Sequence, residues 1–458
     1  MVRPEKLKVS CTVLKLNSPL RHGDIAVLLA TWVLCLTGMA RASEQTTTAQ
    51  EEAVQQSAGA LDTTDSRQIG QAPDDISRKL DRLEQPKESM VGRTVLDPVL
   101  DRWRSISETL KSETGLAVGI AYTTLYQRLT DKKAGNDPKE GAVGDLDIFG
   151  EWSLPGTEAD RSWFVGYQAE MRHRLFTSSR PSELGASAGS LWGTTDGFNT
   201  QDMSLVQLWW QQAFFDEALR YRIGKVDQVD FFDIGTFNSA NLFFSNAAFS
   251  ASPTIAAPEN GLGAAVSVSP SDNWYLNVGM GDANGRKTSM GFSSFFDDND
   301  YFTAAEFGLT PKIQGYGQGY YQFTVWHTDG RKIHNKPKQS SGKGFSLRFE
   351  QYFGEDVLPF VTYSRASGGA TAVRQLVTAG VGLRDIFGYK DDIVGVAVGW
   401  GQPEDRSLRN QTVAELFYRM QISDYLQLTP DIQIIREPSR NRDNDTIGVF
   451  GLRLRLVF

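Results

Sequence analysis

The sequence predicts an all-β transmembrane barrel of about sixteen antiparallel strands, connected up and down, with a short N-terminal helix on the periplasmic side. Three observations support this fold class. Segments of alternating apolar and polar side chains follow one another from residue 115 to residue 458. Short and long connections alternate between these segments, and the chain ends on the aromatic Phe458. Outer-membrane barrels combine strands of this period with short turns at one end and long loops at the other.

Residues 1–42 are typical of a secretory signal peptide. A basic region precedes the apolar run "IAVLLATWVLCLTGMA", and the small residues Ala40 and Ala42 precede the predicted cut. A membrane anchor is the less favoured alternative, because the run is short. Cys11 and Cys35 both lie in this segment, so we expect a mature chain without a disulfide or a Cys metal site. Removal of the segment changes the formal charge from −8 to −12, which disfavours nucleic-acid binding.

Residues 43–90 form a polar segment, rich in Gln, Thr, Ala and Asp, that we expect to be flexible. Within it, "DDISRKLDRLEQ" places Ile76, Leu80 and Leu83 at helical spacing before Pro86. A helix this short is marginal alone, so a fraying helix is favoured over an oligomerising one.

Residues 91–114 contain a predicted periplasmic amphipathic helix. Asp97 is the expected N-cap, Pro98 suits the first turn, and Gly115 ends the helix. We expect the helix to dock at the periplasmic mouth of the barrel through one apolar face, made of Val99, Trp103, Ile106 and Leu110.

From residue 115 onward the hydrophobic period changes from 3.6 to 2, and residues 115–458 form the predicted outer-membrane barrel. The predicted strands are Leu116–Leu129, Asp145–Leu154, Arg161–Leu175, Ser204–Phe214, Leu219–Lys225, Gly263–Ser269, Trp274–Asp282, Tyr301–Thr310, Gly317–Thr328, Gly344–Tyr352, Val357–Arg365, Gln375–Asp385, Asp392–Gly401, Thr412–Gln421, Leu426–Glu437 and Asp445–Phe458.

The alternation assigns each strand a lipid face and a lumen face. In the last strand, Leu454 and Phe458 share the apolar side, and Arg453 and Arg455 share the other. A soluble β-sandwich is the alternative, but its connections would not alternate regularly between short turns and long loops. We therefore expect the two arginines to face water in the lumen.

The connection between residues 226 and 262 is long and unusually apolar, since it contains "NLFFSNAAFSASPTIAAP". Sixteen strands leave a water-filled channel rather than a packed interior. We expect this connection to fold inward and narrow the channel, in preference to packing over the rim.

Four stretches, "RIGKVDQVDFFD", "FFSNAAFSASPTIAAPENGLGAAVSV", "NWYLNVGMGDANG" and "YLQLTPDIQIIREP", resemble in order and spacing the carbohydrate-selective porins of the OprB type. The resemblance covers about residues 97–458. It implies passive, selective diffusion of small neutral sugars across a Gram-negative outer membrane, with the inward connection as the constriction. The final Phe458 is similar to the C-terminal signal through which the barrel-assembly machinery inserts such proteins among outer-membrane lipids.

A sugar-selective channel needs planar hydrogen-bond donors and carboxylates beside aromatic surfaces. Trp209 shares the parity of the polar residues on its strand, and stacking on a sugar or packing against an inward loop are equal alternatives for it. The candidate channel-lining residues on the strands are Gln168, Glu170, Arg172, Gln207, Trp209, Gln211, Arg220 and Arg222, and those on the inward connection are Asp230, Phe231 and Asn238.

The sequence contains no convincing catalytic constellation. His327 and His334 lie near or in an external loop, and His173 falls on the lipid side of its predicted strand without a partner serine. We expect no enzyme activity, no cofactor and no metal. The alternatives to a carbohydrate porin are a general or ion-selective diffusion porin and a structural outer-membrane tether. The sequence leaves open whether the barrel is a homo-oligomer.

Overall fold

The computed structural model describes residues 68–458, apart from residues 92–93, 154–162 and 333–338. The predicted signal peptide and most of the polar segment lie outside the described residues. No helix among the described residues is both long enough and apolar enough to cross a membrane.

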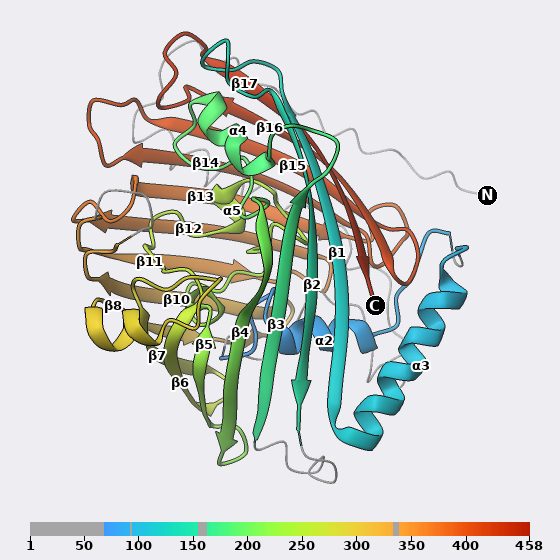
Figure 1. The fold of residues 1–458 in the computed structure, drawn as a ribbon. Coiled ribbons are helices and arrows are strands. Elements are labelled where there is room, and N and C mark those ends of the chain that lie inside the picture. The colour runs from blue at the N-terminus through green and yellow to red at the C-terminus, as the bar shows by residue number, and fades with distance from the viewer. Residues whose placement is uncertain (1–67, 92–93, 154–162, 333–338) are drawn as a thin grey trace, which may run out of the picture. The chain divides into compact units, whose positions relative to one another are not determined.

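Sixteen long antiparallel strands of the described chain close into a barrel (Figure 1). Strand β1 (Leu116–Leu129) pairs with both β2 and β17, and every other long strand pairs with the long strands before and after it. The two-residue β9 (Lys312–Ile313) pairs with the start of β10. The remaining strands are β2 (Glu140–Trp152), β3 (Trp163–Arg174), β4 (Gln201–Phe214), β5 (Leu219–Val226), β6 (Gly261–Ser271), β7 (Trp274–Asp282), β8 (Tyr301–Leu309), β10 (Gly317–Thr328), β11 (Gly342–Gln351), β12 (Val357–Ser367), β13 (Val373–Arg384), β14 (Ile393–Pro403), β15 (Gln411–Gln421), β16 (Leu426–Arg436) and β17 (Thr446–Val457).

The predicted barrel of sixteen strands is confirmed, and the strand ends differ from the prediction by a few residues. The largest difference is in β2, which begins at Glu140 rather than Asp145, because Glu140 pairs with Arg128 of the long first strand. Backbone pairing therefore continues beyond the alternating pattern that defined the predicted strand. The short β9 lies in a turn and carries no such pattern.

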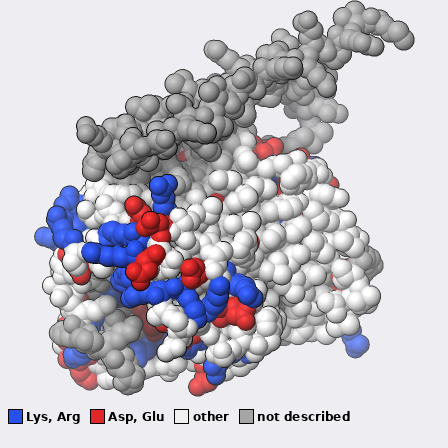
Figure 2. Space-filling model, turned by 90° about the horizontal axis from the view of Figure 1, so that it is seen from above, with Lys and Arg blue, Asp and Glu red and all other residues white. Residues whose placement is uncertain are grey.

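The exposed fractions confirm the predicted faces of the last strand. Leu452 and Leu454 are 47% and 40% exposed on the outer surface, whereas Arg453 and Arg455 are 2% and 4% exposed on the inside. Seen from above, charged side chains gather in one area, and a broad neighbouring area of the wall carries almost none (Figure 2). This distribution suits a wall that contacts lipid.

Three parts of the chain occupy the barrel interior. The first is the connection between β5 and β6, with η1 (Gln228–Asp230) and α5 (Ala247–Ser250). The second is the connection between β3 and β4, with α4 (Pro181–Ala188). The third lies before β1 and contains α2 (Ile76–Glu84). Buried aromatic residues of the first connection meet the inner faces of β12 and β15, so the main apolar core lies inside the barrel.

Helix α3 (Asp97–Thr114) joins β1 and lies beside the barrel (Figure 1). Gly115 ends it at φ 73°, as predicted. The predicted docking face is wrong in part, because Val99 and Ile106 remain exposed. The helix docks instead through polar and aromatic contacts: the Trp103 ring lies 6.2 Å from that of Phe458, and the Tyr425 hydroxyl donates to Asp101 over 2.6 Å.

The predicted N-cap of α3 is also wrong. The Asp97 carboxylate accepts hydrogen bonds from the backbone nitrogen and the hydroxyl of Thr94, at 2.7 and 2.6 Å. It therefore fixes the turn that precedes the helix rather than the first helical nitrogens.

Candidate functional site

Residues 227–260, here called the luminal loop, are held across the barrel by carboxylates of the opposite wall. Glu350 on β11 accepts from the backbone nitrogen of Thr236 at 3.1 Å. Glu415 on β15 accepts from the backbone nitrogens of Ser245 and Asn246 at 2.6 and 2.9 Å. Buried backbone N–H groups need partners, so these carboxylates allow a loop without regular structure to lie inside the barrel.

The same loop carries an aromatic cluster that packs against the inner faces of β12 and β15. The ring of Phe244 lies 5.2 Å from Phe249, 5.9 Å from Phe360 and 4.8 Å from Phe417. Leu184 and Trp192 of the β3–β4 connection belong to the same buried cluster. The lumen beside β10–β16 is therefore packed as an apolar core rather than filled with water.

Arg453 is not the water-facing residue that its strand position predicts. Its guanidinium donates to the backbone carbonyls of Ala240 and Phe243, the latter at 2.8 Å. Arg455 donates to the Thr123 hydroxyl on β1 at 2.6 Å. Both arginines do lie on the lumen face, but Arg453 uses its charge to anchor the luminal loop.

Residues 68–85, here called the luminal segment, pack against the opposite wall. The Arg222 guanidinium meets Asp75 at 2.6 Å, and both side chains are almost completely buried. The same guanidinium stacks 3.6 Å from the ring centre of Trp209. Lys79 donates to Gln168 at 3.1 Å. These contacts contradict the expectation that this part of the polar segment is flexible, because its charged residues find partners on β3 and β5.

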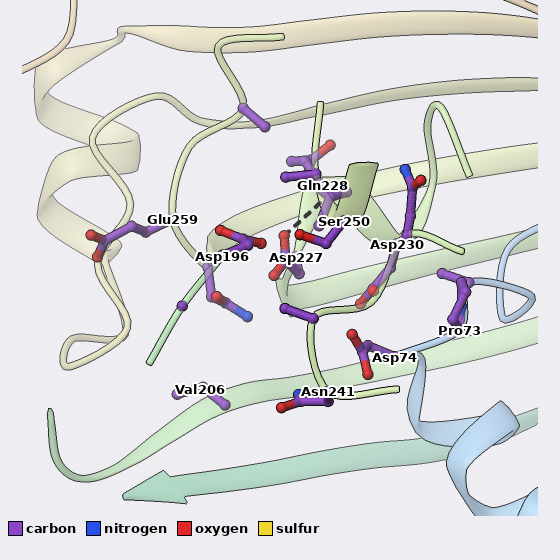
Figure 3. A pocket seen from close by; sticks show the side chains of 18 of the residues that line it. Pro73, Asp74, Asp196, Val206, Asp227, Gln228, Asp230, Asn241, Ser250 and Glu259 are labelled. Carbon is purple, nitrogen blue, oxygen red and sulfur yellow. Dashed lines mark hydrogen bonds between the residues drawn. The ribbon is translucent and has the colours of Figure 1, made fainter. Parts of the chain in front are cut away.

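A cavity of about 410 Å³ remains between the luminal loop, the luminal segment and strands β2–β4. Figure 3 shows Pro73 and Asp74 of the segment on one side, with Asp227, Asp230 and Asn241 of the loop nearby. The cavity therefore lies off the barrel axis, against the wall that the aromatic cluster leaves free.

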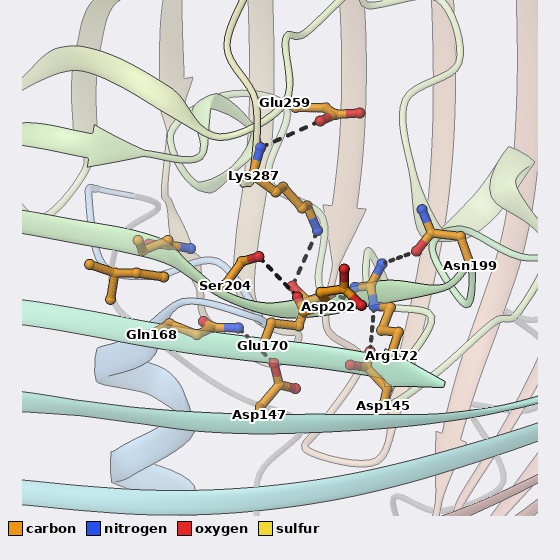
Figure 4. A network of polar contacts seen from close by, with 12 residues as sticks. Asp145, Asp147, Gln168, Glu170, Arg172, Asn199, Asp202, Ser204, Glu259 and Lys287 are labelled. Atoms are coloured by element: carbon orange, nitrogen blue, oxygen red, sulfur yellow. Dashed lines mark hydrogen bonds and ion pairs between the residues drawn. The ribbon is translucent and has the colours of Figure 1, made fainter. Parts of the chain in front are cut away.

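A polar network lines the β2–β3 side of this cavity (Figure 4). Arg172 donates to Asp145 at 3.0 Å and also forms an ion pair with Glu170. Lys287 reaches the other oxygen of Glu170 at 3.3 Å. Gln168 donates to Asp147 at 2.8 Å. Each side chain fixes the position of its neighbour, so the polar groups have defined positions on the cavity wall.

Residues 177–458 match the family described as "Carbohydrate-selective porin, OprB family". The match covers more than half of the chain. The chain belongs to the OprB family.

Sequence relatives of this OprB-family chain are porins. The Porin AaxA of Chlamydia felis is 26% identical over 382 residues, which cover 79% of this chain and 83% of the relative. That of Chlamydia caviae is 24% identical and covers 79% and 82%. The high-pH structure of Pseudomonas putida OprB has a TM-score of 0.61 at 16% identity, covering 81% of this chain and 99% of that one. The likeness to that structure supports the fold alone.

Six of the eleven candidate residues of this OprB-family chain line the cavity, and the other five do not. Trp209 and Arg222 do lie inside the barrel, but they are stacked on each other and covered by the luminal segment. Of the two alternatives for Trp209, packing against an inward loop agrees better with this arrangement, since Trp209 and Phe231 belong to one buried cluster. The cavity is lined by Gln168, Glu170, Arg172, Gln207, Asp230 and Asn238, and it is not lined by Trp209, Gln211, Arg220, Arg222 or Phe231.

Several lining residues were missed in the sequence. Asp145 and Asp147 alternate with Leu146 and Ile148, so their parity could have identified them. Lys287 lies in a loop without regular alternation, and no pattern in the sequence marks it. Asp74 and Lys79 line the cavity as well, and they were missed because the segment that carries them was expected to be flexible.

Carboxylates dominate the cavity. Nine acidic residues line it, against Lys79, Arg172 and Lys287. Burial raises the pKa of the Asp196 carboxyl, and burial together with the neighbouring Asp227 raises the pKa of Asp230 well above its usual range. Despite the many carboxylates, no group of three or more His, Cys, Asp or Glu residues in the described chain is arranged to hold a metal ion.

Proposed function

We propose that this OprB-family barrel carries small carbohydrates passively across a Gram-negative outer membrane, through the cavity between the luminal loop and the luminal segment. The family description and the confined polar cavity are the observations that support this function most directly. The cavity volume of about 410 Å³ lies in the usual range for small-molecule sites, about 300–1,000 Å³. Fixed carboxylates, amides and a guanidinium provide hydrogen bonds for hydroxyl groups.

Liposome swelling tests this function. Purified barrels in liposomes are given a series of mono- and disaccharides beside amino acids of matched size. Faster entry of the monosaccharides supports a carbohydrate porin. Equal entry of sugars and amino acids supports a general diffusion porin, and the absence of any conductance supports a structural tether.

An ion-selective porin is the second candidate, and the excess of carboxylates favours it specifically. Uncompensated charge in a narrow channel attracts counter-ions, and salt screens that attraction. Sugar-dependent block of the ion current separates the two functions. A strong cation preference without any sugar block would assign the protein to the ion-selective class.

The proposal extends to export and assembly. Residues 1–42 act as a cleaved signal peptide, and Phe458 serves the barrel-assembly machinery during insertion among outer-membrane lipids. N-terminal sequencing of the mature protein tests the first statement. Surface delivery of a variant that lacks Phe458 tests the second. Cross-linking in the membrane establishes whether the working unit is a homo-oligomer.

A further inference from the structure

The carboxylates of the cavity exceed the cations that pair with them. Asp145 and Glu170 are balanced by Arg172 and Lys287. Asp233 is balanced by Arg348, at 3.2 Å behind the cavity wall. Within the described residues, six lining carboxylates have no ion pair within 4.0 Å, and Lys79 is the remaining lining cation. The six are Asp74, Asp147, Asp196, Asp227, Asp230 and Glu259.

Unpartnered atoms of the lining side chains add a second and independent observation. Asp145 Oδ1, Gln228 Oε1 and Asn260 Oδ1 have no hydrogen-bond partner, although these residues are only 1%, 3% and 3% exposed. Gln228 donates through Nε2 to the carbonyl of Met280 at 3.2 Å, which fixes its oxygen as the free end. Buried acceptors without partners are costly, so they identify a place where a donor is missing.

Every buried side-chain atom without a partner among the described lining residues is an acceptor. Asp74, Asn238 and Asn241 each contribute one more such oxygen, and none of these buried unpartnered atoms is a nitrogen. A hydroxyl can donate one hydrogen bond, whereas an ammonium group donates three and also carries the charge that the carboxylates lack. A solute with a positively charged nitrogen therefore complements the cavity better than a neutral sugar of the same size.

We propose that the cavity selects among sugar-sized solutes by charge, and that it favours those carrying a protonated amino group over neutral and anionic ones. This inference rests on the proposed function, since it assumes that solutes of sugar size enter the cavity. The selecting groups come from the luminal loop, from β2 and from the luminal segment, so no single strand determines the preference.

Three probes of nearly equal size test the inference at neutral pH: glucosamine as the cation, glucose as the neutral sugar and glucuronate as the anion. In liposome swelling at low salt, we expect glucosamine to enter several-fold faster than glucose, and glucuronate to enter most slowly. Salt should reduce the differences, because it screens the carboxylates. Reversal potentials in a KCl gradient should show a preference for K⁺.

The variant D196N/D230N keeps the side-chain shapes and removes two of the carboxyl groups that have no ion pair. We expect it to lose most of the advantage of glucosamine while glucose entry stays unchanged. The matched control D356N removes a carboxylate from the exposed β11–β12 turn and should leave the order of the three probes unchanged. Heat-modifiable migration on gels verifies that both variants are folded.

The outcomes separate the inference from the function on which it rests. Equal entry of glucosamine and glucose, or faster entry of glucuronate, overturns the inference and leaves the carbohydrate porin standing. Conductance of ions without entry of any of the three probes overturns both. A glucosamine advantage that survives in D196N/D230N shows that these carboxylates do not select the solute, and it also overturns the inference.

Discussion

The luminal loop and the luminal segment both occupy the barrel, but they are attached in different ways. The loop is joined to β5 and β6 and contributes rings to the largest buried cluster, including Phe244 and Phe249. The segment contributes Ile69, Ile76 and Leu80 to a second, smaller buried cluster, and it adds the buried ion pair Asp75–Arg222 and several single hydrogen bonds. Core packing is lost only when the whole cluster opens, whereas polar contacts can exchange with water one by one.

The difference shows which insert sets the minimum width of the channel. The loop is part of the apolar core of the barrel, so it keeps its position as long as the barrel stays folded. The segment combines a smaller apolar contact with a buried ion pair to the wall, so we expect its position to respond more readily to mutation of its charged residues. We expect the loop to determine whether a constriction exists and the segment to adjust how narrow it is.

Trimming the loop should give the largest effect. Replacing Asn241–Pro258 by a short Gly-Ser linker removes the aromatic cluster and one side of the cavity. Single-channel conductance should rise several-fold, and any sugar-dependent block should disappear. A linker of the same type placed at the exposed residues Asp405–Ser407 serves as the control. Unchanged conductance in a correctly assembled trimmed barrel would show that the loop does not constrict the channel.

Removing a loop anchor should have the next largest effect. In Glu415→Ala, the backbone nitrogens of Ser245 and Asn246 lose their acceptors, at a cost of about 1–3 kcal/mol each if they stay buried. The barrel should lose its heat resistance on gels at a lower temperature, and its current should become noisier. Glu355→Ala, at an exposed position in the β11–β12 turn, is the matched control. Equal heat resistance of the two variants would contradict the role assigned to Glu415.

Breaking the ion pair of the segment should have a smaller effect on the fold. Asp75→Ala leaves the Arg222 charge buried without its partner, which costs about 3–5 kcal/mol unless the segment moves away. We expect the segment to be released, with a moderate rise in conductance and unchanged heat resistance. Protease accessibility of residues 68–85 from the short-turn side measures this release. A lowered heat resistance would show instead that the segment is part of the core.

Changing the pH should give the smallest effect. The carboxyls of Asp196, Asp227 and Asp230 have raised pKa values, so they are neutral at low pH and ionise as the pH rises through those values. Cation preference should therefore increase with pH. The cations that face these carboxyls are Lys79, Arg172, Arg222 and Lys287. Reversal potentials between pH 5 and 8 check the trend, and a preference that falls with pH contradicts it.

The barrel could be predicted from the sequence because its strands obey a local rule. In an alternating strand, the odd or even position of a residue decides whether its side chain faces lipid or lumen. This rule alone placed Leu454 on the lipid face and Arg453 on the lumen face. The inward fold of the luminal loop followed from its apolar composition. The luminal segment could not be predicted in the same way, because its partners, such as Arg222 for Asp75, lie more than a hundred residues away. A polar composition alone predicts that a segment is exposed to solvent. Its burial becomes clear only when the charged partners on the opposing barrel wall are known.

Arg222 shows the same limit within the site. Its parity placed it in the lumen, but parity cannot tell whether a third element covers it. Gln168 and Glu170 share that parity and do line the cavity. The difference between them depends on where the segment enters, which is a long-range property of the folded chain.

The position of the cavity against one wall has an evolutionary consequence. The residues that meet a solute and the residues that hold the barrel together belong to different sectors of the ring. If the proposed function holds, substitutions on β2 and β3, or on the segment that covers them, change the preferred solute without disturbing the phenylalanine cluster. Solute preference can then change during evolution while the residues that stabilise the barrel stay the same.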